Sequence, residues 1–273
     1  MPAATHTDTE LPSVRVLGAD LLSTTAYQRR LALGRPFLGV VAYALAAYAG
    51  LWWLTPWLVF LIFVAVVTVT HDVVHGSLGL SRRQTDWALF AMGAVLLESG
   101  HAYRLTHLKH HRDFPALDDP EGDPARMSLL RAVLCGPLFL PRLWVWAYAH
   151  ARPGSTDRRW LAAEAAWAFT VVLGGFVLIH RTPAVLVYAA LAIVGSWVYP
   201  LLTVHLPHRG YGDTPLTQTH TLRGRVIPAL FLELTYHLEH HLYPEVPSHN
   251  LPELSKRLDP LLRQAGVEPW HVP

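Results

Sequence analysis

At 273 residues, the chain is long enough for one large domain or two small ones. Hydrophobic residues make up 52% of it and charged residues only 15%, well below the roughly 25% that soluble domains carry. The net charge of +2 argues against a nucleic-acid partner, and the single cysteine, Cys135, excludes an intrachain disulfide and a thiolate metal cluster.

The first 35 residues are polar and of mixed charge, and they contain no apolar core of signal-peptide form. We expect residues 1–35 to be a cytoplasmic N-terminal arm, partly disordered, that ends in a short surface helix running to Arg35. A single membrane domain is expected over residues 36–273.

A long uncharged run follows, from Pro36 to Thr70. It is far longer than the roughly 20 residues that one bilayer crossing needs. Tryptophans and Pro56 interrupt it near the middle, where a turn at a membrane interface would fall. We therefore predict two crossings, near 36–54 and 56–75; a buried hairpin of a soluble protein is the alternative.

Three histidine clusters are the main functional signal: HDVVH at 71–75, HLKHH at 107–111 and HLEHH at 237–241. On a helix, positions i, i+3 and i+4 share a face, so each cluster directs its imidazoles to one side. A lone buried histidine is usually a hydrogen-bonded core residue, whereas three clusters with matching spacing indicate a shared metal site. Neutral imidazole suits iron, zinc, copper and nickel.

The segment 76–159 holds eleven arginines and lysines between apolar stretches. Helices near 85–99 and 128–148 are expected to lie in the interface or to dip into it. Two further spans are predicted near 160–180 and 183–206. The first contains Glu164, which should lie near the interface or face other helices, because an intramembrane carboxylate is costly.

The basic residues orient the predicted spans. In this arrangement, Arg181 lies on one side of the membrane and the other 21 lysines and arginines lie on the opposite side. The positive-inside rule then places both termini and all three histidine clusters on the cytoplasmic side. A last amphipathic segment is expected near 251–265. The predicted fold is an all-α integral membrane protein with four transmembrane helices and a cytoplasmic helical cap that holds the metals.

The number of histidines implies at least two metals, because four ligands saturate one structural zinc. Just past the fourth span, His205 and His208 can each reach the same cytoplasmic pocket. His101 and His220 are weaker candidates, because neither has partners at ligand spacing.

Three functional classes compete for such a site. A metal transporter would need ionisable residues along a path through the bilayer, and the spans are nearly free of them. A metal-dependent hydrolase usually adds a carboxylate base and keeps few ligands. An iron pair that activates oxygen to oxidise a lipid C–H bond fits the histidine-rich shell and the apolar surroundings better.

From about residue 36 to 265, the three boxes, their order and their placement resemble the membrane-bound fatty acid desaturase superfamily, which uses a non-haem di-iron centre. In that superfamily a further ligand lies just beyond the fourth span, a position that His208 occupies 29 residues before His237. The resemblance therefore implies nine ligands to two ferrous ions, with O2 as co-substrate. They are His71, His75, His107, His110, His111, His208, His237, His240 and His241.

Within the superfamily, the boxes most resemble those of bacterial carotenoid hydroxylases and ketolases. The acidic HLKHHRDFPALDDPEGDP and the segment LPHR at 206–209 carry this likeness. EHHLYPEVPSHNL is also close to acyl-lipid desaturases, which remain the alternative. Front-end desaturases differ, because they have glutamine where His237 stands.

This resemblance implies an enzyme of the bacterial inner membrane that hydroxylates or ketolates a carotenoid. No glycine-rich nucleotide or flavin motif is visible, so a ferredoxin or similar donor is expected to dock from the cytoplasm. The basic segment 76–159 offers a surface for that donor, and contact with anionic membrane lipid is the alternative role for its charges. Ligand histidines usually donate their second N–H to a carboxylate or carbonyl. The carboxylates available for that role are Asp72, Asp118, Asp119, Glu121, Asp123 and Glu239. Asp119 and Asp123 each precede a proline, so the alternative is that they form turns.

Overall fold

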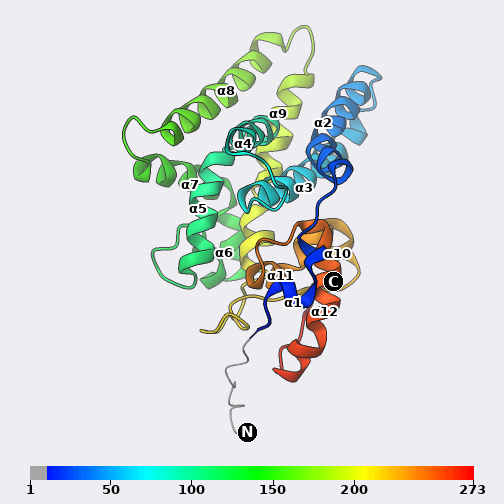
Figure 1. Cartoon of the computed structure of the whole chain (residues 1–273). Helices are drawn as coiled ribbons and strands as arrows, with labels where there is room; N and C mark the ends of the chain where they lie inside the picture. The colour runs from blue at the N-terminus through cyan, green and yellow to red at the C-terminus, as the bar shows by residue number, and fades with distance from the viewer. Residues whose placement is uncertain (1–10) are drawn as a thin grey trace. The chain divides into compact units, whose positions relative to one another are not determined.

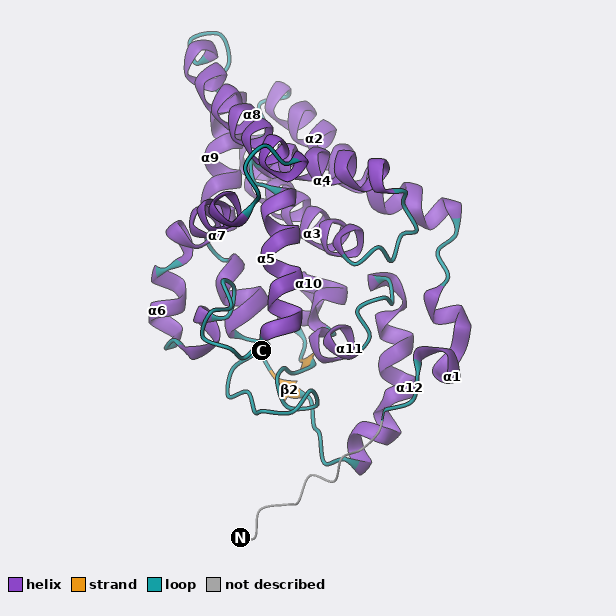
Figure 2. Cartoon of the chain, turned by 60° about the vertical axis from the view of Figure 1, so that its left-hand side comes forward, coloured by secondary structure: helices purple, strands orange, loops and turns teal. Residues whose placement is uncertain are grey.

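The computed structural model describes residues 11–273; residues 1–10 of the predicted N-terminal arm lie outside the described part. Helices make up most of it, and its two strands, β1 (Leu222–Arg223) and β2 (Trp270–His271), form one short parallel pair (Figure 2). The chain divides into two compact units. The larger is Thr25–Leu206, and the smaller joins the residues up to Thr24 with Pro207–Pro273.

Four helical stretches of the larger unit are long and apolar enough to cross a membrane, as predicted. They are Ala26–Tyr48, Trp52–Val74, Thr156–Leu178 and Ala184–His205. The first contains α2 (Ala26–Tyr48) and the second α3 (Thr55–Val74), and these helices pack together; α8 (Thr156–Leu178) and α9 (Ala184–Ser196) form the other pair (Figure 1). A single π-helical stretch, Pro200–His205, completes the fourth span.

The first span begins ten residues earlier than predicted. Thr25 caps α2 through a capping box, in which its side chain accepts from the Gln28 backbone and Gln28 reaches back to the Thr25 backbone. Pro36, where the prediction began the span, is buried within this helix. The helix therefore continues beyond the uncharged run, and the boundary predicted between residues 35 and 36 falls inside it.

Between the two helix pairs, the larger unit has shorter helices. They are α4 (Arg82–Leu96), α5 (Gly100–Asp113), the 3-10 turn η3 (Asp123–Arg126), α6 (Leu129–Leu134) and α7 (Gly136–His150). Helix α5 contacts α3, α4, α7 and α8, so it is central to this unit. Its position brings the second histidine cluster beside the C-terminal end of α3.

Glu164 faces other helices, one of the two placements expected for it. Its side chain is buried, and its two oxygens accept hydrogen bonds from Ser99 and from Nδ1 of His101, the latter at 2.8 Å. The His101 ring stacks on Trp160, with ring centroids 5.0 Å apart. This contact joins α8 to α5 in the interior of the larger unit.

The smaller unit packs around one amphipathic helix, α12 (Leu251–Gln264), which the sequence predicts at 251–265. Its other helices are α1 (Val14–Gly18), η1 (Ala19–Leu22), α10 (Val226–Phe231), η5 (Leu232–Thr235), α11 (His237–Leu242) and η6 (Ser248–Asn250). Leu254 and Leu258 are fully buried, together with Leu21 and Leu238. This core fixes the orientation of α11, which carries the third histidine cluster.

Candidate metal centre

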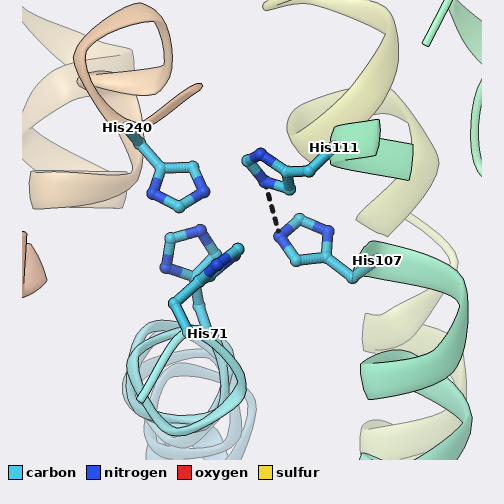
Figure 3. A group of neighbouring side chains, drawn as sticks. His71, His107, His111 and His240 are labelled. Carbon is cyan, nitrogen blue, oxygen red and sulfur yellow. Dashed lines mark hydrogen bonds between the residues drawn. The ribbon is translucent and has the colours of Figure 1, made fainter. Parts of the chain in front are cut away.

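Four histidines of the larger unit come together at one place. His71 lies in the last turn of α3 and His75 directly follows that helix, while His107 and His111 lie one turn apart on α5. Each offers a ring nitrogen, and these nitrogens all lie within 4.8 Å of one another. Figure 3 shows the rings of His71, His107 and His111 directed toward a common point from α3 and α5.

The spacing of the rings fits a metal ion. The Nε2 atoms of His107 and His111 are 3.2 Å apart, and the His75 ring centroid is 4.6 Å from that of His111. Metal–imidazole bonds of about 2.0–2.1 Å at a right angle place two ligand nitrogens about 3 Å apart. This pair therefore has the separation expected for neighbouring ligands of one ion.

Buried carboxylates orient two rings of the second cluster. Glu121 accepts from Nδ1 of His107 at 3.1 Å, and Asp119 accepts from Nδ1 of His110 at 2.7 Å. With the proton on Nδ1, the lone pair of each ring is on Nε2, where a metal can accept it. The carboxylates thus select the tautomer that the metal needs.

Burial also keeps His75 and His107 neutral. It lowers the pKa of His75 to about 2, with the neighbouring His71 adding to the effect, and it lowers the pKa of His107 well below its usual value. Neutral imidazole is the form that binds metals. Burial raises the pKa of Glu121 to about 7, against the lowering effect of His110 and Thr106.

The acidic run after the second cluster has mixed roles. Asp119 both accepts from the Glu121 backbone N–H, as a turn former does, and holds His110. By contrast, Asp123 pairs with Arg142, and Asp118 pairs with Lys109. The sequence left these roles open, because it does not show which carboxylates fold back onto α5.

We expect Glu121→Gln to weaken metal binding by about 10- to 100-fold, the usual effect of losing a group that orients a ligand. The amide can turn its N–H group toward His107 and favour the wrong tautomer. Iron retained against a graded series of chelator concentrations measures this change. Asp118→Asn is the matched control, because Asp118 is exposed and pairs with Lys109 rather than with a clustered histidine. Equal iron retention by the two variants would contradict this role for Glu121.

A second group of converging histidines lies in the smaller unit. His237 and His241 are one turn apart on α11. His208 lies near the start of the segment Pro207–Pro273 of the same unit. The Nε2 atom of His237 is 3.0 Å from that of His208 and 3.1 Å from that of His241. Nδ1 of His208 donates to the Gln218 carbonyl at 2.9 Å, which leaves Nε2 for a metal. The distances between these ring nitrogens match those expected for neighbouring ligands of one metal ion, as they do in the first group.

The last two predicted ligands accompany these clusters within their own units. The ring of His110 is 6.0 Å from those of His107 and His111, and the ring of His240 is 5.7 Å from that of His241. Both are buried. That all nine histidines act together at one centre stays a prediction.

The weaker histidine candidates have other partners. His205 donates through Nδ1 to the Pro124 carbonyl, His101 contacts Glu164, and the His220 ring contacts the Arg209 carbonyl. Within residues 11–273, none of them belongs to a group of converging ligand atoms. His208 rather than His205 therefore lies among the clustered histidines.

An apolar cavity adjoins the histidines of the larger unit. It has a volume of about 60 Å3, and its walls include Phe63, Met92, Leu143 and Trp144. Thr70, which precedes His71, and Tyr103 also line it. Because Tyr103 stacks on the His107 ring with centroids 4.6 Å apart, the cavity ends beside the first group of histidines.

The sequence did not identify the polar residues of this cavity. Glu98, Ser196 and Tyr199 line it, although they come from separate parts of the chain. The one available signal was Glu98 itself, a single carboxylate at the end of an apolar stretch.

Comparisons with known proteins agree with this geometry. A family model described as fatty acid desaturase matches residues 50–273. A beta-carotene ketolase of Paracoccus sp. (strain N81106 / MBIC 01143) is 27% identical over 228 residues, which cover 79% of this chain and 81% of that protein. A second beta-carotene ketolase, of Paracoccus sp. (strain PC1), is 27% identical over 229 residues, or 78% of this chain and 79% of the relative.

Desaturases also match. A chloroplastic omega-3 fatty acid desaturase of Sesamum indicum is 22% identical over 267 residues, which cover 83% of this chain and 60% of that protein. The family match covers most of the chain, including all three histidine clusters. The chain therefore belongs to the fatty acid desaturase family and is an integral membrane enzyme of the di-iron oxygenase and desaturase class.

Proposed function

We propose that this enzyme uses O2 and two ferrous ions to hydroxylate or ketolate a carotenoid. The observation that carries the proposal is the apolar cavity that ends at Tyr103, directly on the ring of His107. A carbon held in such a cavity lies beside the metal ligands and away from water. The similarity to two beta-carotene ketolases supports a carotenoid as the substrate.

The proposed iron centre uses the nine predicted histidines. Four of them converge within the larger unit and three within the smaller one, and each set offers imidazole ligands for an ion. When bound, a pair of ferrous ions supplies the reduction of O2 and the oxidation of an unactivated C–H bond. Hydroxylation then balances as RH + O2 + two electrons + two protons giving ROH + H2O.

The side chains around the site have separate tasks in this reaction. Glu121 and Asp119 hold the rings of His107 and His110 in the ligand tautomer. Apolar groups such as Phe63 and Leu143 exclude water and position the lipid carbon. The protein thus provides orientation and a dry site, which are what a metal-dependent oxidation requires of it.

We place the metal site and both termini on the cytoplasmic side of a bacterial inner membrane, because nearly all basic residues lie on that side in the four-span arrangement. The electrons would come from a ferredoxin or a similar carrier. Arg82, Arg83 and Arg131 are exposed on the basic segment and can attract an acidic protein. One desaturase relative, from Synechocystis, carries ferredoxin in its name.

An acyl-lipid desaturase is the second candidate, favoured by the omega-3 desaturases among the relatives. The reaction would then remove two hydrogens from an acyl chain to form a double bond, rather than insert oxygen. The shape of the histidine clusters does not separate these outcomes, so the substrate has to be tested directly.

Expression in bacteria that accumulate β-carotene, followed by pigment chromatography, tests the proposal. We expect new hydroxy or keto carotenoids in cells with the intact chain and none in cells with the His107→Ala variant. Unchanged pigment together with newly unsaturated fatty acids would overturn the carotenoid proposal in favour of the acyl-lipid desaturase.

A further inference from the structure

One buried hydroxyl group at the cavity has no hydrogen-bond partner. Thr70 is only 7% exposed, and its side-chain oxygen forms no hydrogen bond within residues 11–273. Among the residues of this range that line the cavity, no other has a fully buried side-chain nitrogen or oxygen without a partner. A buried hydroxyl without a hydrogen bond is unfavourable for folding, so its presence here requires an explanation.

A neighbouring threonine shows how such a hydroxyl is usually satisfied in a helix. Thr68 is also buried on α3, and its hydroxyl donates to the Val64 carbonyl one turn earlier at 2.9 Å. On α8, Thr170 donates to the Ala166 carbonyl in the same way at 2.7 Å. A hydrogen bond to the carbonyl four residues back is the ordinary arrangement for a threonine inside a helix. Thr70 does not form this bond, so its hydroxyl is available to a molecule in the cavity.

The face of α3 that carries Thr70 leads from the cavity to the histidines. Residues three or four positions apart on a helix share one face, and four such residues of α3 line the cavity: Phe63, Val66, Val67 and Thr70. His71, a member of the first group of histidines, comes four residues after Val67 and continues the same row. The Thr70 hydroxyl therefore belongs to the part of the cavity that adjoins this group.

The size of the cavity suits a small molecule. Its volume is about 60 Å3, and a single buried water needs roughly 10–15 Å3 of such space. The cavity thus accepts a molecule as small as dioxygen, while most of a lipid has to lie outside it. Its wall is largely apolar, which also suits dioxygen, the co-substrate of the proposed reaction.

We propose that the Thr70 hydroxyl is a catalytic hydrogen-bond donor, which stabilises the negative charge that O2 acquires while it is reduced beside the first group of histidines. The inference rests on the proposed function, because it takes the reduction of O2 to occur at this site. The hydroxyl keeps its own proton in this role, so the overall reaction keeps the same balance of electrons and protons.

The missing partner in the folded protein is what makes Thr70 suitable for this role. Neutral O2 is a weak acceptor of hydrogen bonds, whereas a negatively charged oxygen is a strong one. The hydroxyl therefore gains its partner only as the charge develops. An interaction that forms at that stage lowers the barrier of the reaction instead of tightening the binding of the substrates.

The first test measures stability and needs neither metal nor turnover. Thr70→Val removes the hydroxyl from the metal-free full chain in detergent and nearly keeps the shape of the side chain. We expect the denaturant midpoint to rise, because an unpaired buried polar group is lost. Thr68→Val is the matched control, since it removes a hydrogen-bonded hydroxyl from the same helix and should not raise the midpoint. An unchanged or lower midpoint for Thr70→Val overturns the inference.

The second test measures the turnover of β-carotene by the iron-loaded enzyme with a reductant. We expect Thr70→Val to lower kcat about a hundredfold with little change in KM, the usual result of losing a donor to developing charge. Thr70→Ser keeps a hydroxyl and should restore most of the kcat, and Thr68→Val should keep all of it. Iron content should be the same in every variant, because Thr70 is not among the clustered ligands. Full turnover by Thr70→Val, or a Thr70→Ser variant that is equally slow, overturns the inference.

The choice of substrate separates this inference from the proposed function. If the unaltered enzyme leaves β-carotene unchanged but desaturates an acyl lipid, the carotenoid proposal fails. The same variants are then compared on the acyl lipid, because either reaction reduces O2. If the unaltered enzyme oxidises β-carotene and Thr70→Val does so at the same rate, the proposed function stands and the role of Thr70 is wrong.

Discussion

Replacing His107 by alanine is expected to remove most of the bound iron and to lower turnover by more than a hundredfold. His107 is buried, its ring nitrogen lies with those of His71, His75 and His111, and Glu121 fixes its tautomer. Losing a group that merely orients a ligand costs about 10- to 100-fold in metal affinity or activity, so losing the ligand itself should cost more.

Iron analysis of the purified protein and the pigment assay together measure the effect of His107→Ala. The control is His150→Ala, because His150 is exposed at the end of α7 and contacts Trp146 rather than either histidine cluster. Circular dichroism shows whether the helices are kept. A folded His107→Ala variant with full iron and full turnover would exclude this residue from the metal centre.

Much of the fold was predictable because its causes are local. The uncharged run from Pro36 to Thr70 is far longer than the roughly 20 residues that one bilayer crossing needs, and it indicated the first pair of spans. The i, i+4 spacing of His71 and His75 likewise placed both rings on one side of α3. The start of α2 was missed because a charged first turn capped by Thr25 continues a membrane helix beyond its apolar part.

What sequence reasoning missed depends on contacts between distant residues. Glu121 reaches back 14 positions to His107, while the similar Asp123 turns to Arg142. The sequence does not show which of these two carboxylates reaches α5, because the fold of the segment that contains them decides it. Glu98 and Ser196 meet at the cavity from positions about a hundred residues apart, so no local pattern could pair them.

The buried contact between α8 and α5 gives the largest expected effect on stability. Glu164 accepts hydrogen bonds from Ser99 and from His101, and the side chains of Glu164 and His101 are fully buried. Removing one member of such a buried pair leaves its partner desolvated and uncompensated, which costs about 3–5 kcal/mol. We therefore expect Glu164→Leu to lower the free energy of unfolding by about 3 kcal/mol, measured by chemical denaturation of the metal-free protein in detergent.

A double variant separates this electrostatic cause from a loss of packing. Replacing both members of a buried pair by apolar residues is often neutral, so Glu164→Leu with His101→Leu should recover most of the stability lost in the single variant. Some loss should remain, because His101 also lies 3.7 Å from Asp86 and stacks on Trp160. Glu245→Leu, at an exposed glutamate, is the control and should unfold like the unaltered chain.

A different order of stabilities among these variants would show that Glu164 and His101 do not join α8 to α5. A Glu164→Leu variant within 1 kcal/mol of the unaltered protein, or a double variant less stable than the single one, would contradict the contact. The readout is independent of iron and of substrate, so it tests the scaffold that carries the second histidine cluster separately from the chemistry. Because α5 holds His107 and His111 as well as His101, loosening this contact should also weaken iron binding in the single variant and restore it in the double one.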